Sequence, residues 1–123
     1  MTKLSEPMTR TITIGEKELK FDQRVAVMIE LEDRFIIRLK TADFDYGDPM
    51  VGRNILCYDL SGELLWRVED SEMTIGEKNT PQSFLGLYLE DDGKIEADNP
   101  DAVFCISPEN GEFYDGVRKG KMG

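Results

Sequence analysis

The sequence contains no histidine, and only two cysteines and one tryptophan, in 123 residues. Without histidine there is no imidazole general base, no Ser-His-Asp or Cys-His nucleophile, and almost no conventional zinc site. Cys57 and Cys105 form neither a CxxC motif nor a disulfide framework. Neither has a cationic sequence neighbour that would activate a thiol, so both are predicted to be small core residues. Whether the two thiols lie close together in space is left open.

Long apolar runs and phosphate-binding loops are also missing. No stretch of about 18 apolar residues occurs, which argues against a transmembrane helix. The N-terminus lacks the charged-then-apolar layout of a signal peptide. The glycines are isolated in turns, so no glycine-rich phosphate loop is present. With few cysteines as well, these absences predict a cytoplasmic protein, unless a signal peptide has been removed. No cofactor and no metal site are predicted.

Basic residues are outnumbered, with 15 Lys and Arg against 25 Asp and Glu and a net charge of -10. A field of this sign repels phosphates and anionic lipids, so neither nucleic acid nor a membrane is an expected partner. A charged surface of this kind keeps a protein soluble. Alternatively, it steers the approach of a basic protein partner.

The sequence is rich in apolar residues that alternate with polar ones, which is the period of a β-strand. The segment 22–40 also fits a helix capped by Asp22, but its many β-branched residues favour strands. We therefore predict an all-β fold, an antiparallel meander of about nine or ten strands. The sheet is either packed in two layers or propeller-fragment-like. Residues 11–117 form the single domain, residues 1–10 a weakly ordered arm, and residues 118–123 a flexible tail.

Three hairpins are predicted from turn residues between alternating segments, at 54–68, 83–97 and 102–114. Gly62 and Gly111 are expected to supply positive φ at two of the turns. Trp66 and Tyr114 follow these glycines and are expected to pack a large apolar area beside each turn. The first and third hairpins can be aligned with one another as two copies of a repeat.

The motif over residues 55–66 is apolar-apolar-x-Tyr-Asp-x-x-Gly-Glu-Leu-x-Trp. It resembles the outer hairpin of the blades in pyrroloquinoline-quinone-type β-propellers, in which a Trp after the turn glycine docks on the neighbouring blade. The second copy departs from this pattern, because Tyr114 stands where the Trp would be. A closed propeller needs four or more blades, whereas this chain offers two or three. The resemblance therefore implies no quinone site.

The best candidate binding site is the loop between Thr41 and Gly52. It combines three acids with two aromatic residues, namely Asp43, Phe44, Asp45, Tyr46 and Asp48. Its alternating oxygens suggest the start of a calcium loop, but the glycine and the closing acid are not where such a loop needs them. An aromatic and acidic surface fits a protein that presents Arg or Lys. Alternatively, the aromatic residues fold back over the sheet edge.

The sequence carries no enzymatic signature and does not by itself determine a function. Its size and charge are similar to those of the small acidic immunity proteins of bacterial toxin–immunity pairs, so the first hypothesis is a non-catalytic domain that binds a basic protein. The second hypothesis is a carboxylate-dependent hydrolase, with two carboxyl groups about 5–10 Å apart in a pocket. The third is a homo-oligomer whose subunits complete a larger β ring.

Overall fold

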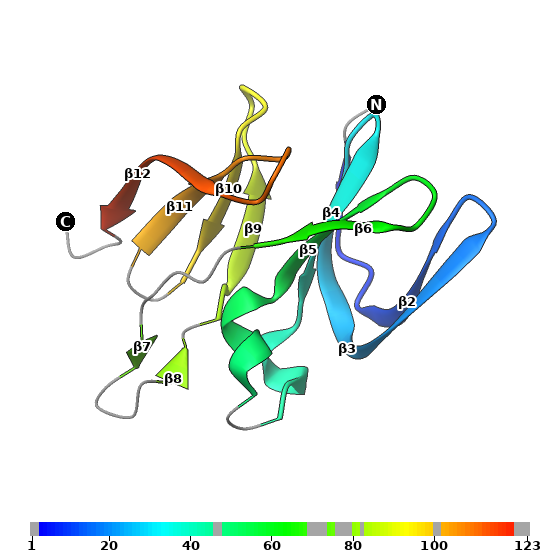
Figure 1. The fold of residues 1–123 in the computed structure, drawn as a ribbon, viewed down its shortest axis with the longest axis horizontal. Helices are drawn as coiled ribbons and strands as arrows, with labels where there is room; N and C mark the ends of the chain where they lie inside the picture. The colour runs from blue at the N-terminus through cyan, green and yellow to red at the C-terminus, as the bar shows by residue number, and fades with distance from the viewer. Residues whose placement is uncertain are drawn as a thin grey trace.

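The computed structural model describes residues 3–45, 48–68, 74–75, 80–81, 83–99 and 102–119. Over these ranges the chain is all-β and every strand pairing is antiparallel, which confirms the predicted fold class (Figure 1). The strands are β1 (Lys3–Ser5), β2 (Thr9–Ile14), β3 (Lys17–Glu30), β4 (Arg34–Leu39), β5 (Ile55–Asp59), β6 (Leu64–Arg67), β7 (Thr74–Ile75), β8 (Thr80–Pro81), β9 (Gly86–Leu89), β10 (Ile95–Asp98), β11 (Ala102–Ile106) and β12 (Phe113–Lys119). Two short 3₁₀ helices, η1 (Thr41–Asp43) and η2 (Pro49–Arg53), join β4 to β5.

The strands form two main sheets that face each other (Figure 1). The larger sheet has the order β1-β3-β4-β5-β6, with β2 also paired to β3. The smaller sheet has the order β12-β11-β10-β9, and β7 pairs with β8 separately. Most neighbours are consecutive in sequence, as in a meander. None of the helices in the described ranges is long and apolar enough to cross a membrane.

The ambiguous segment 22–40 is two strands, so the strand interpretation is confirmed. In β4 the side chains of Phe35 and Ile37 enter one core, and Ile36 enters another. Both faces of the strand are therefore buried, which produces a continuous apolar run rather than a clean alternation. Because both faces of the strand are buried, the apolar residues of this segment also fit the spacing of a helix.

The start of the chain differs from expectation. Instead of belonging wholly to a weakly ordered arm, residues Lys3–Ser5 form β1 and pair with the end of β3, from Met28 to Glu30. The strand β2 begins at Thr9. This stretch has few apolar residues by which a strand could be recognised in the sequence. An edge strand can form through backbone hydrogen bonds alone, here to a neighbour that is distant in sequence. The tail over residues 120–123 lies outside the described residues.

Two hydrophobic cores lie on opposite faces of the larger sheet. The main core lies between the two sheets and is built around large buried side chains that include Ile29, Ile36, Phe84 and Phe104. The second core lies on the other face, where Ile12 of β2 packs with Phe35 and Ile37. The register of β3 and β4 shifts between Val25 and Val27, and such a bulge bends a strand.

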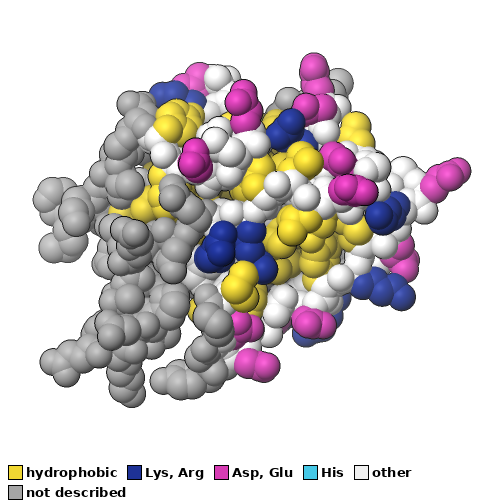
Figure 2. All heavy atoms as spheres, viewed as in Figure 1, with side chains coloured by type: hydrophobic (Ala, Val, Ile, Leu, Met, Phe, Trp, Pro, Cys, Tyr) yellow, Lys and Arg dark blue, Asp and Glu magenta, His cyan; other side chains and the backbone are white. Residues whose placement is uncertain are grey.

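The exposed surface mixes hydrophobic and acidic side chains (Figure 2). Leu60, Leu64 and Leu65 of the β5–β6 hairpin are 53%, 54% and 43% exposed. In the same view, basic side chains gather in one place, where η2 meets the end of β6 (Figure 2). This face therefore carries both apolar area and a local concentration of positive charge.

All three predicted hairpins are present, as β5–β6, β9–β10 and β11–β12. Gly62 and Gly111 adopt φ angles of +87° and +76°, in the left-handed region that their turns require. Trp66 is buried as predicted, and its indole nitrogen Nε1 donates to the Pro108 carbonyl at 2.9 Å. The tryptophan of the first hairpin thus docks on the turn of the third hairpin, in the opposite sheet.

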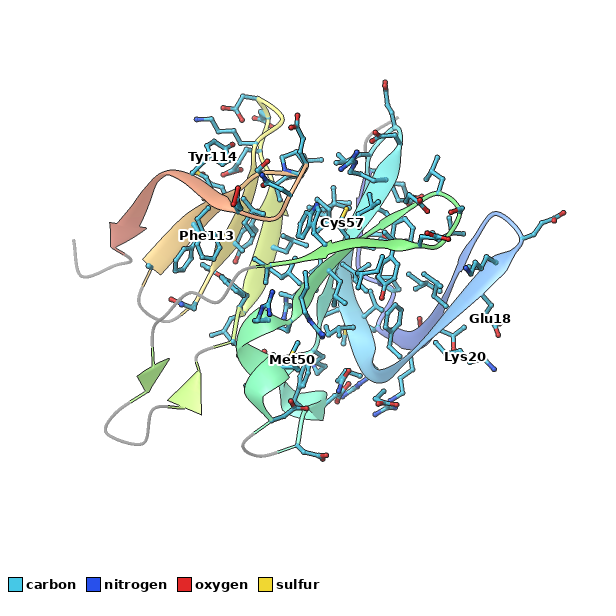
Figure 3. The ribbon with its side chains drawn as sticks, viewed as in Figure 1. Glu18, Lys20, Met50, Cys57, Phe113 and Tyr114 are labelled. Atoms are coloured by element: carbon cyan, nitrogen blue, oxygen red, sulfur yellow. The ribbon has the colours of Figure 1, made fainter. Side chains whose placement is uncertain are left out.

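Tyr114 does not take the corresponding place in the third hairpin. Its side chain is 39% exposed, and the preceding residue supplies the packing aromatic instead (Figure 3). The ring of Phe113 lies against Phe104, with centroids 4.6 Å apart, and near Phe84 at 6.1 Å. Trp66 and Tyr114 stand opposite the equivalent cysteines, Cys57 and Cys105. Cys57 and Trp66 face the main core, whereas in the third hairpin Phe104 and Phe113 do, so Tyr114 lies on the other face.

A buried asparagine joins the two sheets. Asn54 is fully buried, and its Nδ2 donates to the carbonyls of Leu39 and Phe84, both at 2.9 Å. Its Oδ1 accepts from the Phe84 amide at 3.0 Å. This side chain satisfies backbone groups at the end of β4 and just before β9, and so fixes the separation of the sheets.

Candidate binding surface at the turn end

The loop selected from the sequence does not present its acids together. The Oδ2 of Asp43 accepts from Arg24 twice, from its backbone N at 2.8 Å and from its Nε at 2.9 Å. The Oδ1 accepts from Arg24 Nη2 at 2.8 Å, and the Asp43 side chain is only 7% exposed. These bonds hold the pKa of the Asp43 carboxyl well below its usual range. Asp43 therefore anchors η1 to β3 and is not free to contact a partner.

The remaining members of the loop separate in a similar way. Phe44 packs against the second core, as the fold-back alternative predicted. The Oδ1 of Asp48 accepts from the Met50 amide at 2.8 Å and caps η2. Asp45 is exposed, and Tyr46 lies outside the described residues. Of the described members of this proposed patch, only Asp45 presents an exposed side chain.

A different surface is formed where several turns meet, which we call the turn end. Its first groove, of about 300 Å³, lies between the β2–β3 turn and the start of β4 and is lined by Ile14, Glu30, Leu31, Arg34 and Leu60 among others. A second groove, of about 250 Å³, continues from it along Leu31 and Arg34 to Pro108 and Glu109. Shared lining residues make the two grooves one surface.

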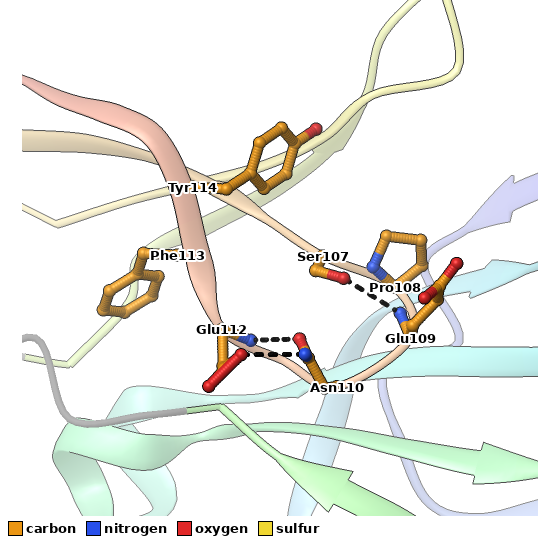
Figure 4. Close-up of a pocket in the computed structure, with 7 residues that line it drawn as sticks. All are labelled: Ser107, Pro108, Glu109, Asn110, Glu112, Phe113 and Tyr114. Atoms are coloured by element: carbon orange, nitrogen blue, oxygen red, sulfur yellow. Dashed lines mark hydrogen bonds between the residues drawn. The ribbon is translucent and has the colours of Figure 1, made fainter.

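A third groove, of about 370 Å³, extends the turn end over the β11–β12 turn (Figure 4). It is lined by Ser107, Pro108, Glu109, Asn110, Glu112, Phe113 and Tyr114. The turn is held by its own polar side chains. Asn110 Oδ1 accepts from the Glu112 amide at 3.0 Å, and Asn110 Nδ2 donates to Glu112 Oε2 at 2.8 Å. Such bonds pre-organise the surface, which reduces the ordering cost of binding.

Arg34 connects the sheets at this end. Its Nη1 donates to the Pro108 carbonyl at 3.0 Å, and the same carbonyl accepts from Trp66. Its Nε lies 3.1 Å from Asp33 Oδ1 in an ion pair, which raises the pKa of Arg34. Arg34 is not recognisable as a site residue from the sequence, because 74 residues separate it from Pro108. Turn residues near Arg34 and near Pro108 can be recognised in the sequence. The sequence does not show that these two turns lie at the same end of the fold.

The described residues give little support for a metal site or for a pair of carboxyl groups in a groove. No group of three or more His, Cys, Asp or Glu residues that could hold a metal ion occurs among them. Glu96 raises the pKa of the Glu90 carboxyl by charge repulsion and hydrogen bonding, so these two acids are close together. Glu90 is exposed, and neither acid lines the three grooves.

The cysteines occupy the core positions that the sequence predicts. Cys57 is fully buried in the main core, and Cys105 is 7% exposed. Neither thiol forms a disulfide bond. Burial raises the pKa of the Cys57 thiol to about 12, so it is not a nucleophile at neutral pH. Cys105 Sγ lies 3.8 Å from Glu96 Oε2.

Comparison with known proteins gives one result. Residues 1–115 match the family described as "Domain of unknown function (DUF7957)". The chain belongs to this family. The match spans both sheets of this DUF7957 domain, so the two-sheet fold and the turn end lie within the family's extent, apart from the last residues of β12. The searches of curated proteins and of solved structures found no match.

Proposed function

We propose that this DUF7957 domain is a non-catalytic protein-binding domain that receives a basic partner at the turn end. The observation that carries the proposal is that exposed Leu60 and acids from two turns, β3–β4 and β11–β12, line adjoining grooves. Glu30 and Leu60 line the first groove, whereas Asp33 and Glu109 line the second. Apolar area framed by acids is the composition that an interface with Arg and Lys residues needs.

The charge of the whole chain supports a basic partner. A net charge of -10 attracts a positive protein at long range and raises its association rate. The shallow shape of the grooves supports a protein rather than a small molecule, because small-molecule sites usually enclose most of the ligand. The backbone carbonyl of Pro108, fixed by Arg34 and Trp66, supplies a rigid centre for the surface.

The test is affinity capture with the immobilised domain, comparing the unaltered chain with Glu109→Lys and with Leu60→Ser. Both residues are exposed, so neither change should alter folding. We expect a basic protein to be captured, to elute as salt is raised, and to be lost with either variant. Salt should weaken capture because the attraction between exposed charges is screened.

Asp45→Lys is the matched control, since Asp45 is exposed and belongs to the loop selected from the sequence. This substitution makes the same change of charge as Glu109→Lys. Asp45 follows η1 and lines none of the three grooves of the turn end. Loss of capture with Asp45→Lys alone would move the binding site to the loop. Capture that survives both turn-end variants, or a partner that is not basic, would overturn the proposal.

A further inference from the structure

Two arginines lie side by side at the junction of η2 and β6. Arg53 Nε donates to the Val68 carbonyl at 2.8 Å, and Arg67 Nε donates to the Arg53 carbonyl at 2.8 Å. Arg53 Nη2 also approaches the Arg67 carbonyl at 3.5 Å. Each side chain is thus held by the backbone next to the other. Figure 2 shows basic side chains gathered on the surface at this junction of η2 and β6.

Neither guanidinium has an acidic partner within the described part of the chain. The ion pairs there are Lys20–Glu18, Arg24–Asp43, Arg34–Asp33 and Lys94–Asp92. Asp48 acts on Arg67 electrostatically, but it makes no ion pair with it and its Oδ1 accepts from the Met50 amide. In a chain with ten more acids than bases, two adjacent arginines without a carboxylate are unexpected. Partial burial, together with repulsion from Arg53, lowers the pKa of Arg67.

A third donor lies on the same face of the sheet. Leu56 pairs with Arg67 and Tyr58 with Leu64, so these side chains share one face of the β5–β6 hairpin. The ring of Tyr58 stacks on Phe35, with centroids 5.6 Å apart, and meets the edge of Phe21. Its hydroxyl interacts electrostatically with Arg67 and has no hydrogen-bond partner in the described ranges.

We propose that Arg53, Arg67 and Tyr58 form a binding site for a phosphate group. The Nε bonds leave the terminal N–H groups of Arg67, and at least those on Nη1 of Arg53, without a protein acceptor among the described residues. Guanidinium forks of this kind bind phosphate through paired hydrogen bonds. A phosphate carries between about -1.5 and -2 charges at neutral pH, so it neutralises both arginines, whereas a carboxylate neutralises one.

The phosphate group can come from free inorganic phosphate or from a phosphate monoester. The apolar residues Leu56 and Leu64 lie on the same face as Arg67, and Leu64 is 54% exposed. An ester with an apolar substituent would place that substituent on this surface and bury it from water. We therefore expect phenyl phosphate to bind more tightly than inorganic phosphate. Equal affinities would identify the free ion as the ligand.

The experiment is titration of the isotopically labelled full chain with inorganic phosphate and, separately, phenyl phosphate at constant ionic strength. The Nε–H signals of Arg53 and Arg67 in ¹H–¹⁵N spectra report binding directly. We expect saturable shifts in these two signals and smaller shifts in Arg24 and Arg34, which are already paired with acids. Acetate at the same concentration should leave them unshifted, and equal binding of acetate would overturn the assignment to phosphate.

Three variants test the residues. Arg67→Gln should weaken binding by about tenfold or more, as expected for the loss of hydrogen bonds to a charged ligand. Arg53→Lys keeps the charge but removes the fork, and should also weaken it. Tyr58→Phe removes only the hydroxyl and preserves the ring packing, so it remains informative if Arg67→Gln fails to fold. Unchanged affinity in Tyr58→Phe and Arg53→Lys would overturn the site.

Lys20→Gln is the control for charge alone. Lys20 is 77% exposed and lies on the outer half of β3, away from η2 (Figure 3). It removes one positive charge, as Arg67→Gln does, and should leave phosphate binding unchanged. An equal loss in both variants would show only a general charge effect, and the absence of saturable shifts in the unaltered chain would refute the proposal.

Discussion

The indole ring of Trp66 lies against the backbone of Gly111. A Cβ atom built on Gly111 would be 2.8 Å from Cδ2 of this ring and 3.0 Å from Cζ3. Gly111 belongs to the β11–β12 turn and Trp66 to β6, so the contact joins the two sheets. The glycine is therefore required twice, for its positive φ and for the space above it. The Trp66 side chain is also part of the main core.

Gly111→Ala should destabilise the fold by about 2–4 kcal/mol, because it adds strain at positive φ and a steric clash. Gly93→Ala is the matched control. Gly93 has a φ of +89°, but a Cβ there meets nothing within 4 Å, so only the strain applies. It should cost about 1 kcal/mol. Urea denaturation measures both, and equal losses would show that the Trp66 contact does not constrain Gly111.

Asn54→Leu should cost about 3 kcal/mol, because it removes the partners of buried backbone groups at Leu39 and Phe84. Hydrogen exchange at the Phe84 amide should accelerate, since this amide donates to Asn54 Oδ1. Asn110→Ala is the control, as Asn110 makes its bonds in an exposed turn and should cost less than about 1 kcal/mol. A small effect of Asn54→Leu would mean that the sheets are positioned by apolar packing alone.

The Asp43–Arg24 pair should make stability depend on acid pH. The pKa of Asp43 is lowered in the folded state, so its contribution is complete above the unfolded value of about 4 and is lost as pH falls toward the folded value. Asp43→Asn should therefore be less stable than the unaltered chain at neutral pH, with a difference that shrinks below that value. Denaturation at a series of pH values measures this. Asp45→Asn removes a carboxylate at an exposed position, and at neutral pH it should destabilise the chain less than Asp43→Asn.

Cys57 should resist thiol reagents in the native state. With a pKa of about 12, its thiolate fraction at pH 8 is lower by a factor of about a thousand than that of an ordinary thiol. The variant Cys105→Ser isolates the Cys57 thiol, and its reaction with a chromogenic disulfide should become rapid only in denaturant. Rapid labelling of a chain that retains its native spectrum would contradict the burial of this side chain.

The sequence alone determined the all-β class, the three hairpins and the turn glycines, because these depend on local alternation and backbone conformation. It also determined that Trp66 is buried, and it excluded histidine-based chemistry. Local patterns could not show that Tyr114 is exposed and Phe113 packed, since they do not specify which face of the third hairpin is turned toward the main core.

Only the tertiary structure decided which side chains meet. Asp43 looked available in the sequence, but 19 residues earlier Arg24 supplies three hydrogen-bond donors to it. The turn end depends on Arg34 and Trp66 reaching Pro108 across 74 and 42 residues. Sheet packing sets such contacts, and a pattern with a period of two residues carries no information about which turns become neighbours.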